Sequence, residues 1–267
     1  MYFEKLCDYL SELSEVEAMA LGGSRAGLRY DEKSDYDLYL YCSATPSEEK
    51  REQILQKCCS YIELGNHFWE LEDDCTLKDG VDIDILYRNL DSFVDEVSSV
   101  VDKHIAHNGY TTCMWHNLIQ SKILFDRNGR LQKLKEKYTI PYPLKLRENI
   151  ISNNLRLLTG NLPSYDKQII KAVKRNDLIS VNHRTAAYME SYFDIIFAMN
   201  ELTHPGEKRM LQVALEKAAK LPEAFEKNIF TLYQDIFSDT DRVENDIFLI
   251  TGKLKDCLNT LQYKTDF

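Results

Sequence analysis

The spacing of apolar residues changes several times within the first part of the chain. Apolar side chains recur at three- and four-residue intervals in residues 1–14, which predicts an amphipathic helix. The short apolar run 16–21 and the alternating segment 34–42 are instead typical of strands. A glycine-containing loop separates these two segments. The chain is therefore expected to begin with a helix followed by two strands.

A second group of elements is predicted between residues 45 and 87. Thr45 is a suitable helix N-cap and Pro46 suits the first helical position, so a helix is expected over residues 46–62. Residues 67–77 and 81–87 are interpreted as strands. The Lys-Asp-Gly turn between them predicts a hairpin.

The pattern of the residues after position 90 indicates a boundary between two domains. Residues 91–107 are helical in pattern, and a strand, a turn at residues 127–129 and a helix follow. Two prolines within residues 139–143 mark a domain boundary, because proline is poorly tolerated inside a helix. We therefore predict an α/β (α+β) domain over residues 1–140, with a mixed sheet flanked by helices. An all-helical domain is predicted over residues 141–267.

Two features of the predicted helix around residue 190 are interpreted structurally. Aromatic residues recur there at helical spacing and are expected to pack in the core; they are Tyr188, Tyr192, Phe193 and Phe197. Glu190 and Asp194 lie four residues apart and are interpreted as a partly exposed helix face. The alternative interpretation is that these two carboxylates line a cleft and bind a cationic acceptor molecule.

Composition and charge narrow the class of protein. The 267 residues carry 33 basic against 43 acidic side chains, a formal net charge of −10 that disfavours a long nucleic acid as partner. No apolar run approaches the roughly 20 residues that span a bilayer, and acidic residues interrupt the N-terminal segment, unlike a signal peptide. Seven scattered cysteines favour reduced thiols. A cytoplasmic protein without membrane partners is expected.

The segment around residue 36 carries the first chemical signal. Successive side chains of a strand point to opposite faces, so Asp35 and Asp37 are expected to face the same way, about 6–7 Å apart. Two carboxylates held together repel each other unless a cation lies between them. Hard cations such as Mg²⁺ prefer oxygen ligands. The pair is therefore a candidate divalent-metal site.

A candidate phosphate-binding loop precedes this pair. Gly22 and Gly23 follow a predicted strand, where glycines let the backbone approach a phosphate closely, and Ser24 adds hydrogen-bond donors. Arg25 is equally compatible with a phosphate contact and with a solvated surface position. Taken alone, the glycines indicate only a tight turn and Ser24 only a helix cap.

A third carboxylate is expected from the strand at residues 81–87. Asp82 and Asp84 alternate along it, and either could reach the metal pair if the two strands are neighbours. Three carboxylates would provide the platform that two-metal nucleotidyl transfer requires. The spacing does not choose between Asp82 and Asp84.

The glycine-serine loop, the segment Ser-Asp-Tyr-Asp-Leu and the later strand together resemble the nucleotidyltransferase superfamily with its polymerase-beta-like palm. Within it the chain is most similar to bacterial single-chain enzymes such as aminoglycoside and lincosamide nucleotidyltransferases. The resemblance covers residues 16–90 specifically and the helical second half more loosely.

The resemblance implies roles for individual residues. Gly23 and Ser24 would bind the triphosphate, and Asp35 and Asp37 two Mg²⁺ ions. Asp84 would be the third carboxylate, as a metal ligand or as the base, with Asp82 as its competitor. Weaker candidates for the nucleotide or acceptor cleft come from the second half; they are Asn200, Lys208 and Arg209, of which Lys208 would contact phosphate.

The expected function is Mg²⁺-dependent transfer of a nucleoside monophosphate, AMP from ATP, to a hydroxyl of a small acceptor such as an aminoglycoside-like antibiotic. Two alternatives stay open. One is a protein adenylyltransferase that modifies a partner protein, and the other is a non-catalytic regulator that binds a nucleotide. The acceptor, the nucleotide base and the oligomeric state do not follow from the sequence.

Overall fold

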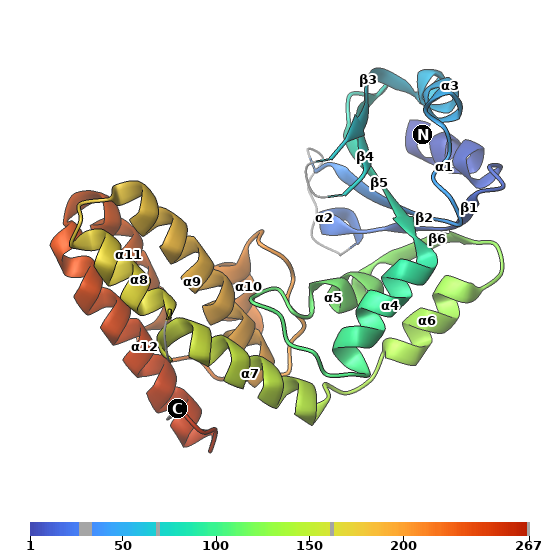
Figure 1. Cartoon of the computed structure of the whole chain (residues 1–267). Coiled ribbons are helices and arrows are strands. Elements are labelled where there is room, and N and C mark those ends of the chain that lie inside the picture. The colour runs from blue at the N-terminus through green and yellow to red at the C-terminus, as the bar shows by residue number, and fades with distance from the viewer. Residues whose placement is uncertain (27–33, 68–69, 161–162, 266–267) are drawn as a thin grey trace. The chain divides into compact units, whose positions relative to one another are not determined.

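A computed structural model describes the chain except residues 27–33, 68–69, 161–162 and 266–267 (Figure 1). The chain divides into two compact units. The first comprises residues 1–98 and 117–140, and the second comprises residues 99–116 and 141–267. These units differ from the domains predicted above in one segment, residues 99–116, which packs within the second unit.

The first unit is built on a six-stranded sheet with the strand order β3-β4-β5-β2-β1-β6. Its strands are β1 (Val16–Leu21), β2 (Tyr36–Cys42), β3 (Cys59–Asn66), β4 (Glu72–Leu77), β5 (Asp82–Asn89) and β6 (Lys122–Asp126). Neighbouring strands are antiparallel, except that β2 and β5 run parallel. This mixed sheet flanked by helices confirms the predicted fold class of the first part of the chain.

Two helices cover one face of this sheet (Figure 1). The helices of the first unit are α1 (Tyr2–Ser11), α2 (Gly23–Ala26), α3 (Glu48–Cys58), α6 (Arg130–Tyr138) and the parts of α4 (Leu90–Val101) and α5 (Cys113–Gln120) that belong to it. Apolar side chains of α1 and α3 pack on alternate residues of the strands, among them Leu38, Ile83 and Ile85, which are fully buried. Period-two alternation therefore leaves Asp37 and Asp84 on the other face.

The predicted helix over residues 46–62 is wrong at both ends. The helix α3 spans Glu48–Cys58, and its N-cap is Ser47, whose hydroxyl accepts a hydrogen bond from the Lys50 N–H at 3.4 Å. The chain then enters β3, where Ile62 and Leu64 pack against the core in the alternation of a strand. The hairpin of β4 and β5 is confirmed, with β4 beginning at Glu72 rather than at residue 67.

A buried ion pair joins α3 to the sheet. Arg51 and Asp73 form a salt bridge in which both side chains are almost completely inaccessible to solvent. Asp73 also accepts hydrogen bonds from the Tyr87 hydroxyl at 2.8 Å and from the Gly65 N–H at 2.9 Å. The ion pair and the hydrogen bonds to Asp73 offset part of the desolvation cost of burying these charges, although the buried Arg51 Nε has no hydrogen-bond partner among the described residues.

The described residues of the second unit form helices and connecting turns, which confirms the predicted helical part. Its elements are α7 (Leu144–Thr159), α8 (Tyr165–Val173), α9 (Leu178–Met199), α10 (Met210–Lys217), α11 (Phe225–Ser238), η1 (Thr240–Arg242) and α12 (Val243–Thr260). The helix α9 packs against α7 and α8. Its aromatic series is buried as expected, from Tyr188 to Phe197.

Asp194 of α9 is not on a partly exposed face but is 2% exposed. Its carboxylate accepts hydrogen bonds from the Thr111 N–H at 3.1 Å, the Thr111 hydroxyl at 2.6 Å and the Asn154 amide at 3.0 Å. Burial raises the pKa of Asp194 to about 7, although these hydrogen bonds act in the opposite direction. The network explains why residues 99–116 belong to the second unit.

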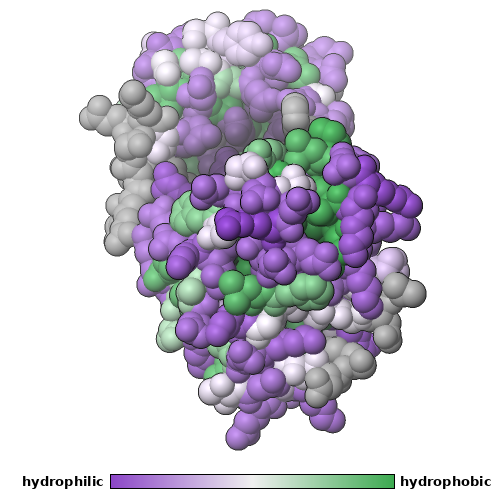
Figure 2. All heavy atoms as spheres, turned by 90° about the vertical axis from the view of Figure 1, so that its left-hand side faces the viewer, coloured by the Kyte–Doolittle hydropathy of each residue, from purple (hydrophilic) through white to green (hydrophobic). Residues whose placement is uncertain are grey.

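The surface is mainly polar on the face that Figure 2 shows, with apolar side chains in small groups. Exposed aromatic residues on α11 and α12 include Phe230, Phe237 and Phe248. Among the described residues, no helix combines the length and the apolar character that a membrane crossing requires.

We predict that Asp73→Asn lowers the free energy of unfolding by about 3–5 kcal/mol, because it removes the buried counter-ion of the Arg51 guanidinium and leaves only the exposed Glu48 carboxylate at 3.8 Å. Urea unfolding of the purified protein measures this change. The matched control is Asp91→Asn, which removes the same charge from the exposed pair with Arg130 and should cost less than about 1 kcal/mol. Equal, small losses in both variants would contradict the prediction.

Candidate active site

The parallel pairing of β2 with β5 places two of the predicted aspartates side by side. Asp37 and Asp84 are register partners in this pair. Neighbouring strands lie about 4.8 Å apart, and register partners project from the same face. The row continues, because Asp84 is also the partner of Asp74 on β4, and Asp74 is the partner of Glu63 on β3. Four acidic residues therefore cross four adjacent strands.

Burial and repulsion between carboxylates both raise the pKa of Asp84, which lies within this acidic row. Burial and the negative charges of neighbouring carboxylates raise the pKa of Asp84 to about 6. These neighbours are, in order of effect, Asp37, Asp74, Asp35 and Glu72. A carboxylate surrounded in this way is stabilised by a proton or by a metal cation.

The predicted glycine loop packs directly on Asp37. The Gly22 N–H donates a hydrogen bond to the Asp37 carbonyl oxygen at 2.8 Å, so this N–H is engaged within the protein. Gly23 has a φ of +57°, and a Cβ at this position would overlap the Asp37 carboxylate. Ser24 is the next residue, within α2. Only glycine at position 23 fits both the backbone conformation and the space.

The two candidates for the third carboxylate have different surroundings. Asp84 is partly buried and lies in the acidic row, whereas Asp82 is exposed and accepts a hydrogen bond from the Thr76 hydroxyl at 2.7 Å. Asp35 directly precedes β2 and acts electrostatically on Asp84. The geometry therefore favours Asp84 over Asp82.

Arg25 is held on the protein itself. Its Nε donates a hydrogen bond to the Ser34 carbonyl oxygen at 2.6 Å. Its guanidinium carbon lies 4.1 Å from the centre of the Tyr36 ring. Arg25 thus connects α2 with the beginning of β2.

The candidates from the second half belong to the second unit, separate from the unit that holds the aspartates. Lys208 and Arg209 are exposed and directly precede α10. Asn200 has a structural role: its amide donates to the carbonyl oxygens of Ile196 and Lys220, and its oxygen accepts from the Lys220 N–H, each at 2.8 Å.

The donor set fits a hard cation. Among the described residues, no three His, Cys, Asp or Glu side chains are close enough to form a complete metal site. Mg²⁺, however, is usually held by one or two carboxylates together with substrate phosphates and waters. Asp37 and Asp84 provide two adjacent carboxylates with Asp35 nearby, and Gly23 lies against the Asp37 carboxylate without a side chain of its own. These residues fit Mg²⁺ bound together with a phosphate compound.

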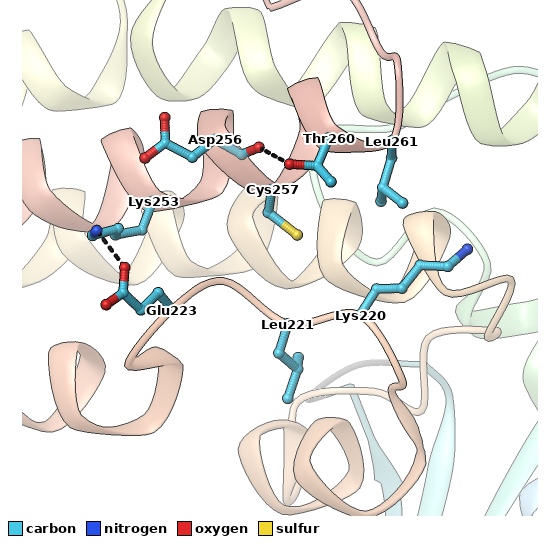
Figure 3. Close-up of a pocket in the computed structure, with 8 residues that line it drawn as sticks. All are labelled: Lys220, Leu221, Glu223, Lys253, Asp256, Cys257, Thr260 and Leu261. Carbon is cyan, nitrogen blue, oxygen red and sulfur yellow. Dashed lines mark hydrogen bonds and ion pairs between the residues drawn. The ribbon is translucent and has the colours of Figure 1, made fainter.

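A separate cavity of about 340 Å³ lies in the second unit, between α12 and the segment before α11 (Figure 3). Its lining residues are Lys220, Leu221, Glu223, Lys253, Asp256, Cys257, Thr260 and Leu261. The Cys257 sulfur points toward the gap, and Lys253 forms an ion pair with Glu223 at one side. The cavity contains none of the predicted site residues.

Two members of the acidic row escaped the sequence interpretation. Asp74 and Glu63 gain their position only through the pairing of β3, β4 and β5. The alternation in residues 59–66 indicates a strand, but the predicted helix over residues 46–62 covers the first half of this segment. The hairpin that the sequence predicts from the turn at residues 78–80 already implies that Asp74 lies opposite Asp84.

Comparisons with known proteins give one partial family match and several distant structural similarities. Residues 111–210 match a family described as a domain of unknown function (DUF4037). The sequence matches none of the curated proteins with which it was compared. Among solved structures, the chain is similar to a nucleotidyltransferase-like protein from Exiguobacterium sibiricum 255-15, at 10% identity and a TM-score of 0.44. That similarity covers 97% of this chain and 73% of the other.

Two further solved structures are similar over most of both chains. An aminoglycoside 6-adenyltransferase from Bacillus subtilis has 10% identity and a TM-score of 0.33, with 98% of this chain and 91% of that chain covered. The Thermotoga maritima CCA-adding enzyme complexed with tRNA has 12% identity and a TM-score of 0.28, with 97% and 80% covered.

The contact between Gly23 and Asp37 gives a prediction for stability. Gly23→Ala should destabilise the protein by the strain of the left-handed conformation, about 1–2 kcal/mol, and by a further 1–3 kcal/mol or so for displacing the Asp37 carboxylate. Gly80→Ala is the matched control, because Gly80 has a φ of +86° and nothing within 4 Å of the added Cβ. Urea unfolding compares the two variants, and equal losses would contradict the close packing at Gly23.

The electrostatics of the acidic row predict a dependence of stability on pH. Without divalent cations, Asp84→Asn should raise the free energy of unfolding more at about pH 7.5 than at about pH 4.5. The folded protein retains the Asp84 proton up to about pH 6, whereas the unfolded chain releases it near its ordinary pKa of about 3.9. The stability that the protonated group contributes is therefore lost progressively as pH rises from about 3.9 to about 6, and a neutral amide avoids this loss.

Urea unfolding at the two pH values measures the effect. The control Asp82→Asn alters an exposed aspartate on the same strand and should change stability equally at both pH values. A loss of stability at the higher pH in Asp84→Asn would contradict the repulsive row.

Proposed function

We propose that this chain is a Mg²⁺-dependent nucleotidyltransferase that transfers a nucleoside monophosphate, AMP from ATP, to a hydroxyl of a small acceptor molecule. The observation that carries this proposal is the register pairing of Asp37 with Asp84 beside the Gly22–Gly23 backbone. It brings two adjacent carboxylates and a glycine loop from three chain segments into one place, which supports binding of a metal ion with a phosphate compound.

Each part of the site has a role in this reaction. The Gly23–Ser24 segment contacts the triphosphate, since the Gly22 N–H is already used by Asp37. Asp35 and Asp37 would hold Mg²⁺ ions, which when bound neutralise triphosphate charge and favour ionisation of the attacking hydroxyl. Asp84 is either a further ligand or the base. Lys208 is the phosphate-contacting candidate of the second unit.

The reaction itself is a substitution at phosphorus. The acceptor hydroxyl oxygen forms a bond to the α-phosphorus, and the bond from this phosphorus to the bridging oxygen of pyrophosphate breaks. The hydroxyl proton passes to Asp84 or to solvent, and pyrophosphate leaves with the bonding electron pair. The side chains thus position the reactants and balance charge, without a covalent protein intermediate.

A direct assay tests this function. Purified protein with Mg²⁺, α-labelled ATP and a panel of hydroxyl-bearing amino sugars and other small acceptors should release pyrophosphate and label a small molecule. Asp37→Asn and Asp84→Asn should each reduce pyrophosphate release by about 100-fold or more, because charge compensation at the phosphates is lost. Asp35→Asn should have the same effect.

Two control variants sharpen the result. Asp79→Asn alters an exposed turn residue and should leave the rate unchanged. Asp82→Asn should retain the rate if Asp84 is the third carboxylate. Undiminished release in Asp37→Asn would overturn the proposed mechanism, and label on protein instead of a small molecule would overturn the proposed acceptor class.

A further inference from the structure

Arg25 connects three elements around the start of β2. Its Nε–H donates to the Ser34 carbonyl oxygen at 2.6 Å, and its guanidinium carbon lies 4.1 Å from the centre of the Tyr36 ring. The same ring stacks on Phe3 of α1, with a centroid distance of 4.0 Å and an angle of 6° between the planes. Because a ring has two faces and Phe3 covers one, the guanidinium covers the other.

This arrangement holds the main chain next to the two aspartates. Ser34 directly precedes Asp35, so a hydrogen bond to the Ser34 carbonyl fixes the planar peptide group that Asp35 shares. Tyr36 lies between Asp35 and Asp37 and projects to the opposite side of the strand. Holding its ring between Arg25 and Phe3 therefore fixes the rotation of the strand about its own axis.

We propose that Arg25 is a positioning residue that fixes Asp35 and Asp37 through Ser34 and Tyr36, rather than a direct ligand of phosphate. The proposal rests on the proposed function and assigns Arg25 a role different from the phosphate contact suggested by the sequence. The extended guanidinium is essential to it, because its carbon lies over the ring while its Nε donates to the Ser34 carbonyl oxygen. A lysine at this position would keep the charge, but its compact ammonium group cannot make both contacts in the same way.

The proposal predicts that variants of Arg25 and Tyr36 behave alike. Arg25→Lys and Tyr36→Leu should each lower kcat for nucleotidyl transfer about tenfold and leave KM for ATP within about twofold, since positioning of the metal-binding carboxylates acts on the chemical step. Tyr36→Phe retains the ring and should behave like the wild type. The double variant Arg25→Lys with Tyr36→Leu should be no worse than either single variant, because both remove the same support.

A second measurement does not depend on turnover. Hydrogen exchange at the amides of residues 35–37, followed by mass spectrometry on the full chain, should become about tenfold faster in Arg25→Lys and in Tyr36→Leu, the size expected from losing a cation–π contact. It should stay unchanged in Tyr36→Phe. The control Arg175→Lys alters an exposed arginine of the second unit and should change neither exchange nor kinetics.

The outcomes separate the alternatives. A rise of KM for ATP in Arg25→Lys, with unchanged exchange and a normal Tyr36→Leu variant, would overturn the proposal in favour of a direct phosphate contact. If the wild type transfers no nucleotide, the proposed function fails. Faster exchange in the two variants would still show that Arg25 holds β2 in place. Unchanged exchange in both variants overturns the proposal whether or not the chain is active.

Discussion

The parallel pairing of β2 with β5 is the constraint on which the candidate site depends. Strands separated by almost forty residues lie side by side, and their register puts Asp37 opposite Asp84. Like charges opposite each other destabilise a sheet. The cost is offset on the reverse face, where Leu38, Ile83 and Ile85 are fully buried beneath α1 and α3. Apolar packing on one face of the sheet thus outweighs the repulsion between carboxylates on the other face.

Two consecutive residues of β4 show how strictly the faces are separated. Asp73 points into the core, where Arg51, Tyr87 and Gly65 satisfy its carboxylate. Asp74 points to the other face and joins the acidic row beside Asp84. A register shift by one residue would exchange the two environments. The buried ion pair therefore secures the register as well as the attachment of α3, and so contributes to the geometry of the acidic row.

Local patterns predicted the elements that carry Asp35, Asp37 and Asp84, because period-two alternation is a property of the residues themselves. The choice between Asp82 and Asp84 needed the register between β2 and β5, which only the folded chain defines. Asp74 could have been placed opposite Asp84 by counting back from the predicted turn at residues 78–80, whereas β3 was missed because its first residues continue a helical pattern. Asp194 was assigned to a partly exposed face, since its partners Thr111 and Asn154 lie 83 and 40 residues away in sequence.

Several neighbouring residues fix the position of Asp37. Gly22 bonds its carbonyl group, Gly23 leaves room for its carboxylate, and the adjacent Tyr36 is stacked on Phe3. The first and the last of these constraints act on the backbone or on a neighbouring residue, and the contact with Gly23 acts on the carboxylate. The strand that carries Asp37 is therefore held in place by contacts within the protein. The proposed nucleotidyl transfer would require this kind of preorganisation.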